Sequence, residues 1–140
     1  MDSAFIIIKE KIDAINKKLK LPERSLPAYG SNESHKSKFS YVSYIYDEYR
    51  LINIDDWRGA ESEIIRTTNI DELIFAFFKN ATISKSWDYE LNNRVPNQDP
   101  RIITFKKHIE ILESLGFVKK YIDPLKNEYN LLINQQLFST

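Results

Sequence analysis

Five charged residues lie close together in the second half of the chain, and their types could do acid–base chemistry. Asp88, Glu90 and Arg94 precede a polar turn, and Asp99 and Arg101 follow it. Two carboxyl groups such as Glu90 and Asp99 can serve as general acid and base when the pKa of one is raised. The surrounding sequence identifies no substrate, so three interpretations stay open: a catalytic site, a partner-binding surface or a structural helix junction.

A structural role explains each member of this charged corner. Glu90 and Arg94 are four residues apart, a favourable pairing on a helix. Asp99 has the position and type of a helix N-cap. Arg101 then falls in a first helical turn, where the helix dipole disfavours a cation, so we expect a carboxylate partner from Glu90 or Asp88. We predict a helix junction held by ion pairs, which can also shape a binding surface.

Other signatures of enzymes and metal sites are absent from the sequence. The two histidines, His35 and His108, have no metal-binding companion at helical spacing, and there is no cysteine. The three glycines lie far apart in the sequence, so no Gly-rich phosphate-binding loop is present, and no nucleophile elbow occurs. Asp55 and Asp56 could bind a cation, but adjacent acids in a turn are usually solvated. We therefore expect no enzyme activity, no metal and no cofactor.

Composition narrows the class of protein further. A chain of 140 residues with 42% apolar content fits a single domain over residues 1–140. Its 20 basic and 20 acidic residues balance, which disfavours general nucleic-acid binding. The apolar run of residues 4–8 is too short to span a membrane or to form a signal-peptide core. We predict a cytoplasmic protein without a membrane partner.

The first helix leaves one alternative open. Apolar residues recur at steps of three and four over residues 4–19, which predicts an amphipathic helix. Five lysines lie on its other faces: Lys9, Lys11, Lys17, Lys18 and Lys20. A solvated face is the ordinary explanation, and a small regulatory protein that binds nucleic acid through this helix is the alternative.

Residues 39–68 predict a small sheet with prominent aromatic residues. After a loop over residues 22–38, with a short extended piece near residues 26–30, β-branched and aromatic residues fill three segments, 39–46, 49–54 and 62–68. Asp47 and Glu48 are expected to form the first turn. Short turns favour an antiparallel meander. Candidate partner-binding residues are Tyr44, Tyr46 and Tyr49, together with Trp57 and Arg58 in the second turn, because exposed aromatic and arginine side chains often anchor interfaces.

The remainder of the chain is predicted to be helical. Residues 70–95 form either one helix or two, because a continuous helix would bring charges onto the line of Phe77. Pro100 starts the next helix, which ends at Gly116. A last helical region spans residues 117–137, with Pro124 as a kink or as its start. The expected fold is α+β: an N-terminal helix, an antiparallel β-meander of about three strands and a C-terminal bundle of three to four helices packed on it.

The order and spacing of several motifs resemble a known family. Thr67 and Thr68 precede "DEL", and a helix then ends in "YELNNR" before "NQDPRIITF" and a leucine-bearing helix. Upstream, Arg58 and Gly59 form a turn before a strand that carries Arg66. These features, over about residues 41–135, are similar to the immunity protein 63 family of bacterial polymorphic-toxin systems. Asn97 stands where that family has glycine, and Ile102 where a second arginine is usual.

The resemblance implies a bacterial, intracellular immunity protein whose partner is a cognate toxin domain. Such a protein would neutralise the toxin by stoichiometric binding and would be a monomer or a weak homodimer. This expectation agrees with the absence of catalytic motifs and with the aromatic and charged surface candidates.

Overall fold

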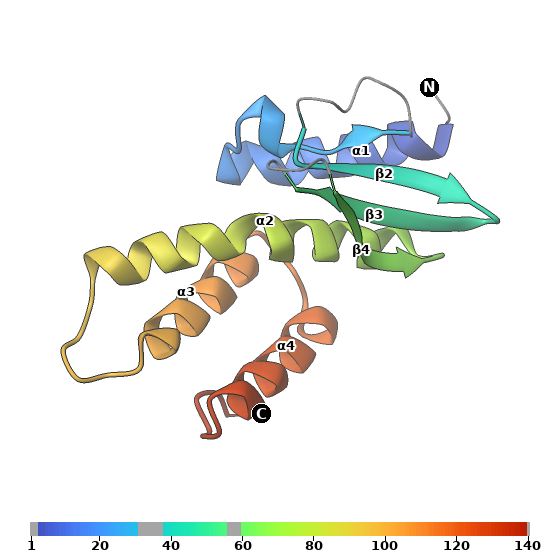
Figure 1. The fold of residues 1–140 in the computed structure, drawn as a ribbon. Helices are drawn as coiled ribbons and strands as arrows, with labels where there is room; N and C mark the ends of the chain where they lie inside the picture. Colours follow the sequence, from blue (N-terminus) through green and yellow to red (C-terminus); the bar gives the residue numbers. More distant parts are fainter. Residues whose placement is uncertain (1–2, 31–37, 56–59, 140) are drawn as a thin grey trace. The chain divides into compact units, whose positions relative to one another are not determined.

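The computed structural model describes residues 3–30, 38–55 and 60–139, which form two compact units, Met1–Phe77 and Phe78–Thr140. The elements follow the order α1, a short 3-10 helix, four strands and three further helices (Figure 1). The fold class is therefore α+β, as the sequence predicts. The prediction of one domain over residues 1–140, and that of a bundle packed on the sheet, stay predictions.

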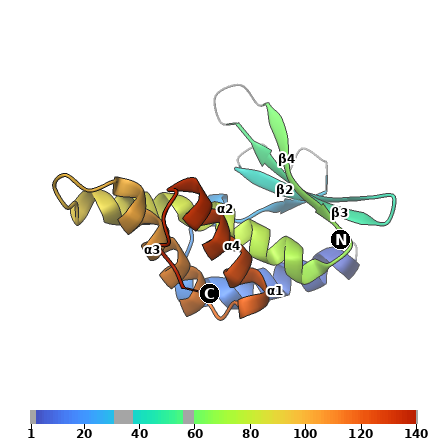
Figure 2. The same ribbon diagram turned by 90° about the horizontal axis from the view of Figure 1, so that it is seen from below.

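The first unit contains α1 (Ser3–Leu19) and a mixed four-stranded sheet in the order β1-β2-β3-β4. The strands are β1 (Ala28–Tyr29), β2 (Ser40–Ile45), β3 (Glu48–Ile54) and β4 (Glu61–Thr67). The last three form the predicted antiparallel meander, and β1 adds a parallel pairing with β2 that the expected three strands lacked. Within this unit, α1 and the start of α2 lie on one face of the sheet (Figures 1 and 2).

The hairpin between β2 and β3 closes one residue earlier than the sequence suggests. Its two turn residues are Tyr46 and Asp47, with φ of +53° and +61°, and Glu48 already belongs to β3. Positive φ at both positions is the pattern of a two-residue type I′ turn, which matches the twist of the flanking strands. The expected turn at Asp47 and Glu48 was wrong by one residue.

The core of the first unit is built from the apolar periodicities seen in the sequence. Ile8 and Ile12 of α1 are almost completely buried, as are Val42 and Leu51, which pair directly across β2 and β3. Ring contact between Phe5 and Tyr29 (5.9 Å between centroids) ties α1 to the short β1. These contacts give the sheet a rigid base from which the hairpin projects.

Helix α2 (Ile70–Asn92) starts in the first unit and continues into the second as one helix, which settles the choice between one helix and two. Asn69 is its cap: its side-chain oxygen accepts hydrogen bonds from the backbone N–H groups of Asp71 (2.9 Å) and Glu72 (3.2 Å). The Thr67 hydroxyl donates to the Glu72 carboxylate at 2.7 Å. Asn69 is therefore the N-cap of α2, and Thr67 holds the acidic side chain of its first turn.

The second unit also contains α3 (Pro100–Ser114) and α4 (Lys119–Leu132). Helix α3 begins and ends as expected, with Asp99 as N-cap and with Gly116 at φ +96° just beyond its end. Helix α4 starts earlier than Pro124, which lies inside it, and Val118 is its N-cap. Of the two roles expected for Pro124, that of helix start was therefore wrong.

Helix α4 ends at Leu132 rather than near residue 137 because the tail folds back. The side-chain oxygen of Asn130 accepts hydrogen bonds from the backbone N–H groups of Leu137 (2.7 Å) and Phe138 (2.9 Å). Asn134, with φ +52°, provides the reversal. The pattern of apolar residues does not reveal that the side chain of Asn130 takes backbone N–H groups that a longer helix would have used.

Candidate functional site

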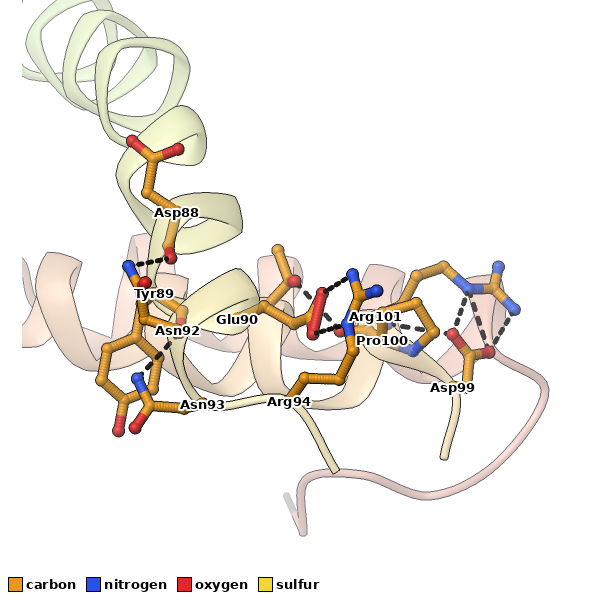
Figure 3. A network of polar contacts seen from close by, with 10 residues as sticks. Asp88, Tyr89, Glu90, Asn92, Asn93, Arg94, Asp99, Pro100 and Arg101 are labelled. Carbon is orange, nitrogen blue, oxygen red and sulfur yellow. Dashed lines mark hydrogen bonds and ion pairs between the residues drawn. The ribbon is translucent and has the colours of Figure 1, made fainter. Parts of the chain in front are cut away.

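The charged corner consists of two separate ion pairs rather than one convergent site (Figure 3). The guanidinium of Arg94 donates through Nε and Nη2 to the two carboxylate oxygens of Glu90, at 3.1 and 2.9 Å. The guanidinium of Arg101 donates to both oxygens of Asp99, the shortest contact being 2.7 Å. Each arginine thus binds its own carboxylate in a two-pronged geometry that suits the planar guanidinium.

The first pair covers a buried charge. The side chain of Glu90 is 1% exposed, whereas that of Arg94 is 60% exposed. The guanidinium beside it holds the pKa of Glu90 below its usual value, so the carboxylate is ionised at neutral pH despite its burial. The exposed guanidinium of Arg94 therefore lies between the buried carboxylate of Glu90 and the solvent.

The second pair joins a cap to a helix end. Asp99 Oδ1 accepts from the backbone N–H of Arg101 at 2.9 Å, and the side chain of Arg101 keeps the pKa of Asp99 low. Another nitrogen of Arg101 donates to the carbonyl oxygen of Leu132 at 3.1 Å, at the end of α4. The expectation that Glu90 or Asp88 would pair with Arg101 was therefore wrong: its partner is its own N-cap.

Asp88 does not join either pair in the part of the chain that the structure describes. Its side chain is exposed, and its backbone carbonyl accepts a hydrogen bond from the side chain of Asn92. The turn after α2 contains Asn97 at φ +65°. Asparagine tolerates this left-handed conformation better than most residues, which explains how it replaces the glycine expected there.

These two pairs do not favour acid–base chemistry. A general acid at neutral pH needs a raised pKa, whereas the pKa values of Glu90 and Asp99 are both lowered by their arginines. Among residues 3–30, 38–55 and 60–139, no group of three or more potential metal ligands occurs. Within the second unit, the bond from Arg101 to the carbonyl oxygen of Leu132 links the start of α3 to the end of α4. The Glu90–Arg94 pair joins the last turn of α2 to the residues just after it.

A buried polar network in the same unit escaped the sequence reasoning. His108 Nε2 lies 3.0 Å from the carbonyl oxygen of Lys79 and 3.0 Å from the hydroxyl oxygen of Thr82, and Nδ1 bonds the hydroxyl of Tyr129. A carbonyl can only accept, so Nε2 carries the proton and the Tyr129 hydroxyl donates to Nδ1. The ring of Tyr129 also stacks on Phe105, with 3.8 Å between centroids.

The pKa values of this network reflect its burial. Desolvation lowers the pKa of His108 to about 4 and raises that of Tyr129, so both side chains are neutral at neutral pH. Thr82 of this network follows Phe78 by four residues, and Ser86 and Glu90 continue the same line along α2; the structure buries all four. The sequence reasoning followed only the line of Phe77, whereas the buried face of α2 also includes the line of Phe78.

The tyrosine candidates lie on the β2–β3 hairpin, and two of them are exposed to solvent. Tyr44 and Tyr49 are directly paired across the β2–β3 hairpin, with ring centroids 4.8 Å apart, and Tyr44 is 41% exposed. Tyr46, in the turn, is 93% exposed. Trp57 and Arg58 lie outside the described residues and stay predictions. The structure thus brings the three predicted tyrosines together at one hairpin end.

The lysines of α1 are partly neutralised. Lys9 lies 2.8 Å from Asp13 of the same helix, and Lys11 lies 3.2 Å from Asp71 at the start of α2. Two of the five lysines therefore have an acidic partner, which reduces the charge that this face could offer to phosphates. No helix in the described part of the chain has the length and apolar character needed to cross a membrane.

Comparison with known proteins identifies the family of this chain. The family model described as immunity protein 63 matches residues 46–130, more than half of the 140-residue chain and close to the range of 41–135 expected from the motifs. No curated protein and no solved structure matches the chain significantly. The matched range runs from the β2–β3 turn through the charged corner into α4. The chain belongs to the immunity protein 63 family.

Proposed function

We propose that this protein neutralises a cognate bacterial toxin domain by binding it stoichiometrically in the cytoplasm, and so protects the cell that makes it. The observation that carries this proposal is the family match over residues 46–130. The site geometry adds support, because the charged residues that could have done catalysis hold one another in ion pairs. The protein would act as a monomer or a weak homodimer.

A pre-formed surface is the expected mode of action. Binding costs less when the contacting side chains are already ordered, and the hairpin tyrosines stand on a sheet with a well-buried base. The protein would cover the active site of the toxin domain or the path of its substrate. We assign a structural role to the pairs Glu90–Arg94 and Asp99–Arg101, and a contact role to Tyr44, Tyr46 and Tyr49. Trp57 and Arg58 are further contact candidates.

The test is a calorimetric titration of the protein into an inactivated toxin domain encoded beside its gene. Saturation at one-to-one stoichiometry with nanomolar affinity is the expected result. Absence of heat and of co-elution, with both proteins shown to be folded by circular dichroism, would overturn the proposal. The alternative, nucleic-acid binding through the lysines of α1, would then be examined by DNA retention at low salt.

A further inference from the structure

No contact within the described residues explains why a tyrosine occupies position 46 of the turn. Its φ of +53° is a conformation that asparagine or glycine adopts readily and a bulky side chain adopts at a cost. Its ring is 93% exposed, so burial does not offset that cost. A strained backbone position that carries an exposed aromatic ring is a reason to look for a function.

The neighbours of Tyr46 extend this feature into a small surface, which we call the tyrosine tip: residues 44–49. Tyr44 and Tyr49 support each other across the hairpin, and the Tyr44 hydroxyl lies 3.4 Å from the Asp47 carboxylate. Ile45 is 42% exposed. Tyrosine gives large contact area for little conformational entropy, and it is enriched among residues that dominate binding energy.

The tyrosine tip is also acidic. Asp47 and Glu48 are its charged residues, and residues 44–49 contain no lysine or arginine. The nearest basic residue along β3, Arg50, pairs with Glu63 at 3.1 Å. Arg66 pairs with the same carboxylate at 2.8 Å and has a weaker charge interaction with Glu48, whereas Asp47 lies farther out in the turn. The tip thus combines a projecting aromatic side chain with two carboxylates, and a complementary partner surface must be concave and basic.

We infer that the tyrosine tip is the anchor by which this protein binds its toxin, with Tyr46 inserted into a cleft whose rim carries lysine or arginine side chains. This inference rests on the proposed function and adds the contact surface and the charge of the cleft. The type I′ turn fixes the backbone of Tyr46 before the partner arrives, so on association only its side chain has to be ordered. The backbone strain at Tyr46 is retained because the ring serves the complex.

The decisive variant is Tyr46→Asn, measured by calorimetric titration into the inactivated toxin domain and by thermal unfolding. Asparagine removes the ring and relieves the turn, so affinity should fall by about 30-fold or more while the unfolding temperature rises. Tyr46→Phe, which keeps the ring, should bind nearly as well as the native protein. A purely structural role of Tyr46 would not make stability and affinity move in opposite directions.

The charge of the cleft is tested by the double variant Asp47→Asn, Glu48→Gln. Association at low salt should slow by about tenfold, and its dependence on salt should weaken. The matched control is Glu110→Gln on α3, whose carboxylate is 70% exposed and should leave association unchanged. Equal salt dependence of the double variant and the native protein would overturn the basic cleft.

Failure of this inference differs from failure of the proposed function. Native protein that saturates the toxin domain, together with a Tyr46→Asn variant of equal affinity, would overturn the tyrosine tip and leave immunity standing. Native protein that does not bind the toxin domain at all would overturn both.

Discussion

The polar groups of the helical unit have partners within the chain, whereas the tyrosine tip of the β2–β3 hairpin is largely exposed to solvent. In the helical unit, Glu90 binds Arg94, Asp99 binds Arg101, and His108 is bonded at both ring nitrogens. At the tyrosine tip, Tyr46 is almost wholly exposed on a strained turn. Groups satisfied within the chain explain the fold, whereas an exposed and strained aromatic residue suggests a partner outside it.

This difference predicts that acid will weaken the helical unit before it affects the carboxylate pairs. The pKa of His108 is about 4 in the folded protein and 6.5 in the reference state, so the unfolded chain takes up the proton first. The contribution of neutral His108 is complete above pH 6.5 and is lost as the pH falls toward 4. At 1.36 kcal/mol per unit of pKa shift, the free energy of unfolding should fall by roughly 3 kcal/mol across that window.

Urea unfolding at a series of pH values checks this, with His108→Gln as the matched variant. Glutamine can donate to the Lys79 carbonyl and accept from Tyr129, but it does not titrate. The pKa values of Glu90 and Asp99 are lowered from 4.5 and 3.8, so their pairs lose stability only at lower pH. Equal slopes for native protein and variant above about pH 5 would contradict the role given to His108.

A second prediction removes one bond from the network while keeping its shape. Tyr129→Phe retains the stacked ring on Phe105 but leaves the buried Nδ1 of His108 without a donor. An unsatisfied buried acceptor costs about 1–3 kcal/mol, so the unfolding free energy should drop by about 2 kcal/mol. Toxin affinity should not change, and a loss of affinity without a loss of stability would place Tyr129 in the interface.

A third, smaller effect concerns the hairpin itself. Tyr49→Thr keeps a residue that favours strands and removes the aromatic partner of Tyr44. Cross-strand pairs of this kind contribute about 0.2–1 kcal/mol, so chemical unfolding should show a loss of about 0.5 kcal/mol. A loss well above 1 kcal/mol would mean that these rings stabilise the fold more than they serve a partner.

Local patterns were sufficient to predict most elements of the fold. The stripe of α1, the β-branched and aromatic segments that form β2 to β4, and the Asp99–Pro100 start of α3 all depend on neighbours in sequence, and all were confirmed. The parallel pairing of β1 was not predictable, because it depends on residues 28 and 29 meeting residues 41 and 42. The end of α4 was missed because the side chain of Asn130 captures the tail.

In the candidate site, too, features that depend on sequence neighbours were predictable, and features that depend on distant contacts or on the exact place of a turn were not. The i, i+4 pairing of Glu90 and Arg94 was predictable from spacing, but the burial of Glu90 was not, since it depends on which face of α2 is covered in the second unit. The grouping of Tyr44, Tyr46 and Tyr49 followed from the hairpin. The strain at Tyr46 did not, because moving the turn by one residue changes which side chain lies at positive φ.

The most direct test measures binding and unfolding together for one variant from each region. Tyr46→Asn at the tyrosine tip and Arg94→Gln, which uncovers the buried carboxylate of Glu90, are titrated into the inactivated toxin domain and melted. We expect Tyr46→Asn to lose affinity and gain stability, and Arg94→Gln to lose stability and keep its affinity. The reverse assignment, with affinity lost at Arg94 and unchanged at Tyr46, would contradict the account and place the toxin contact at the charged corner.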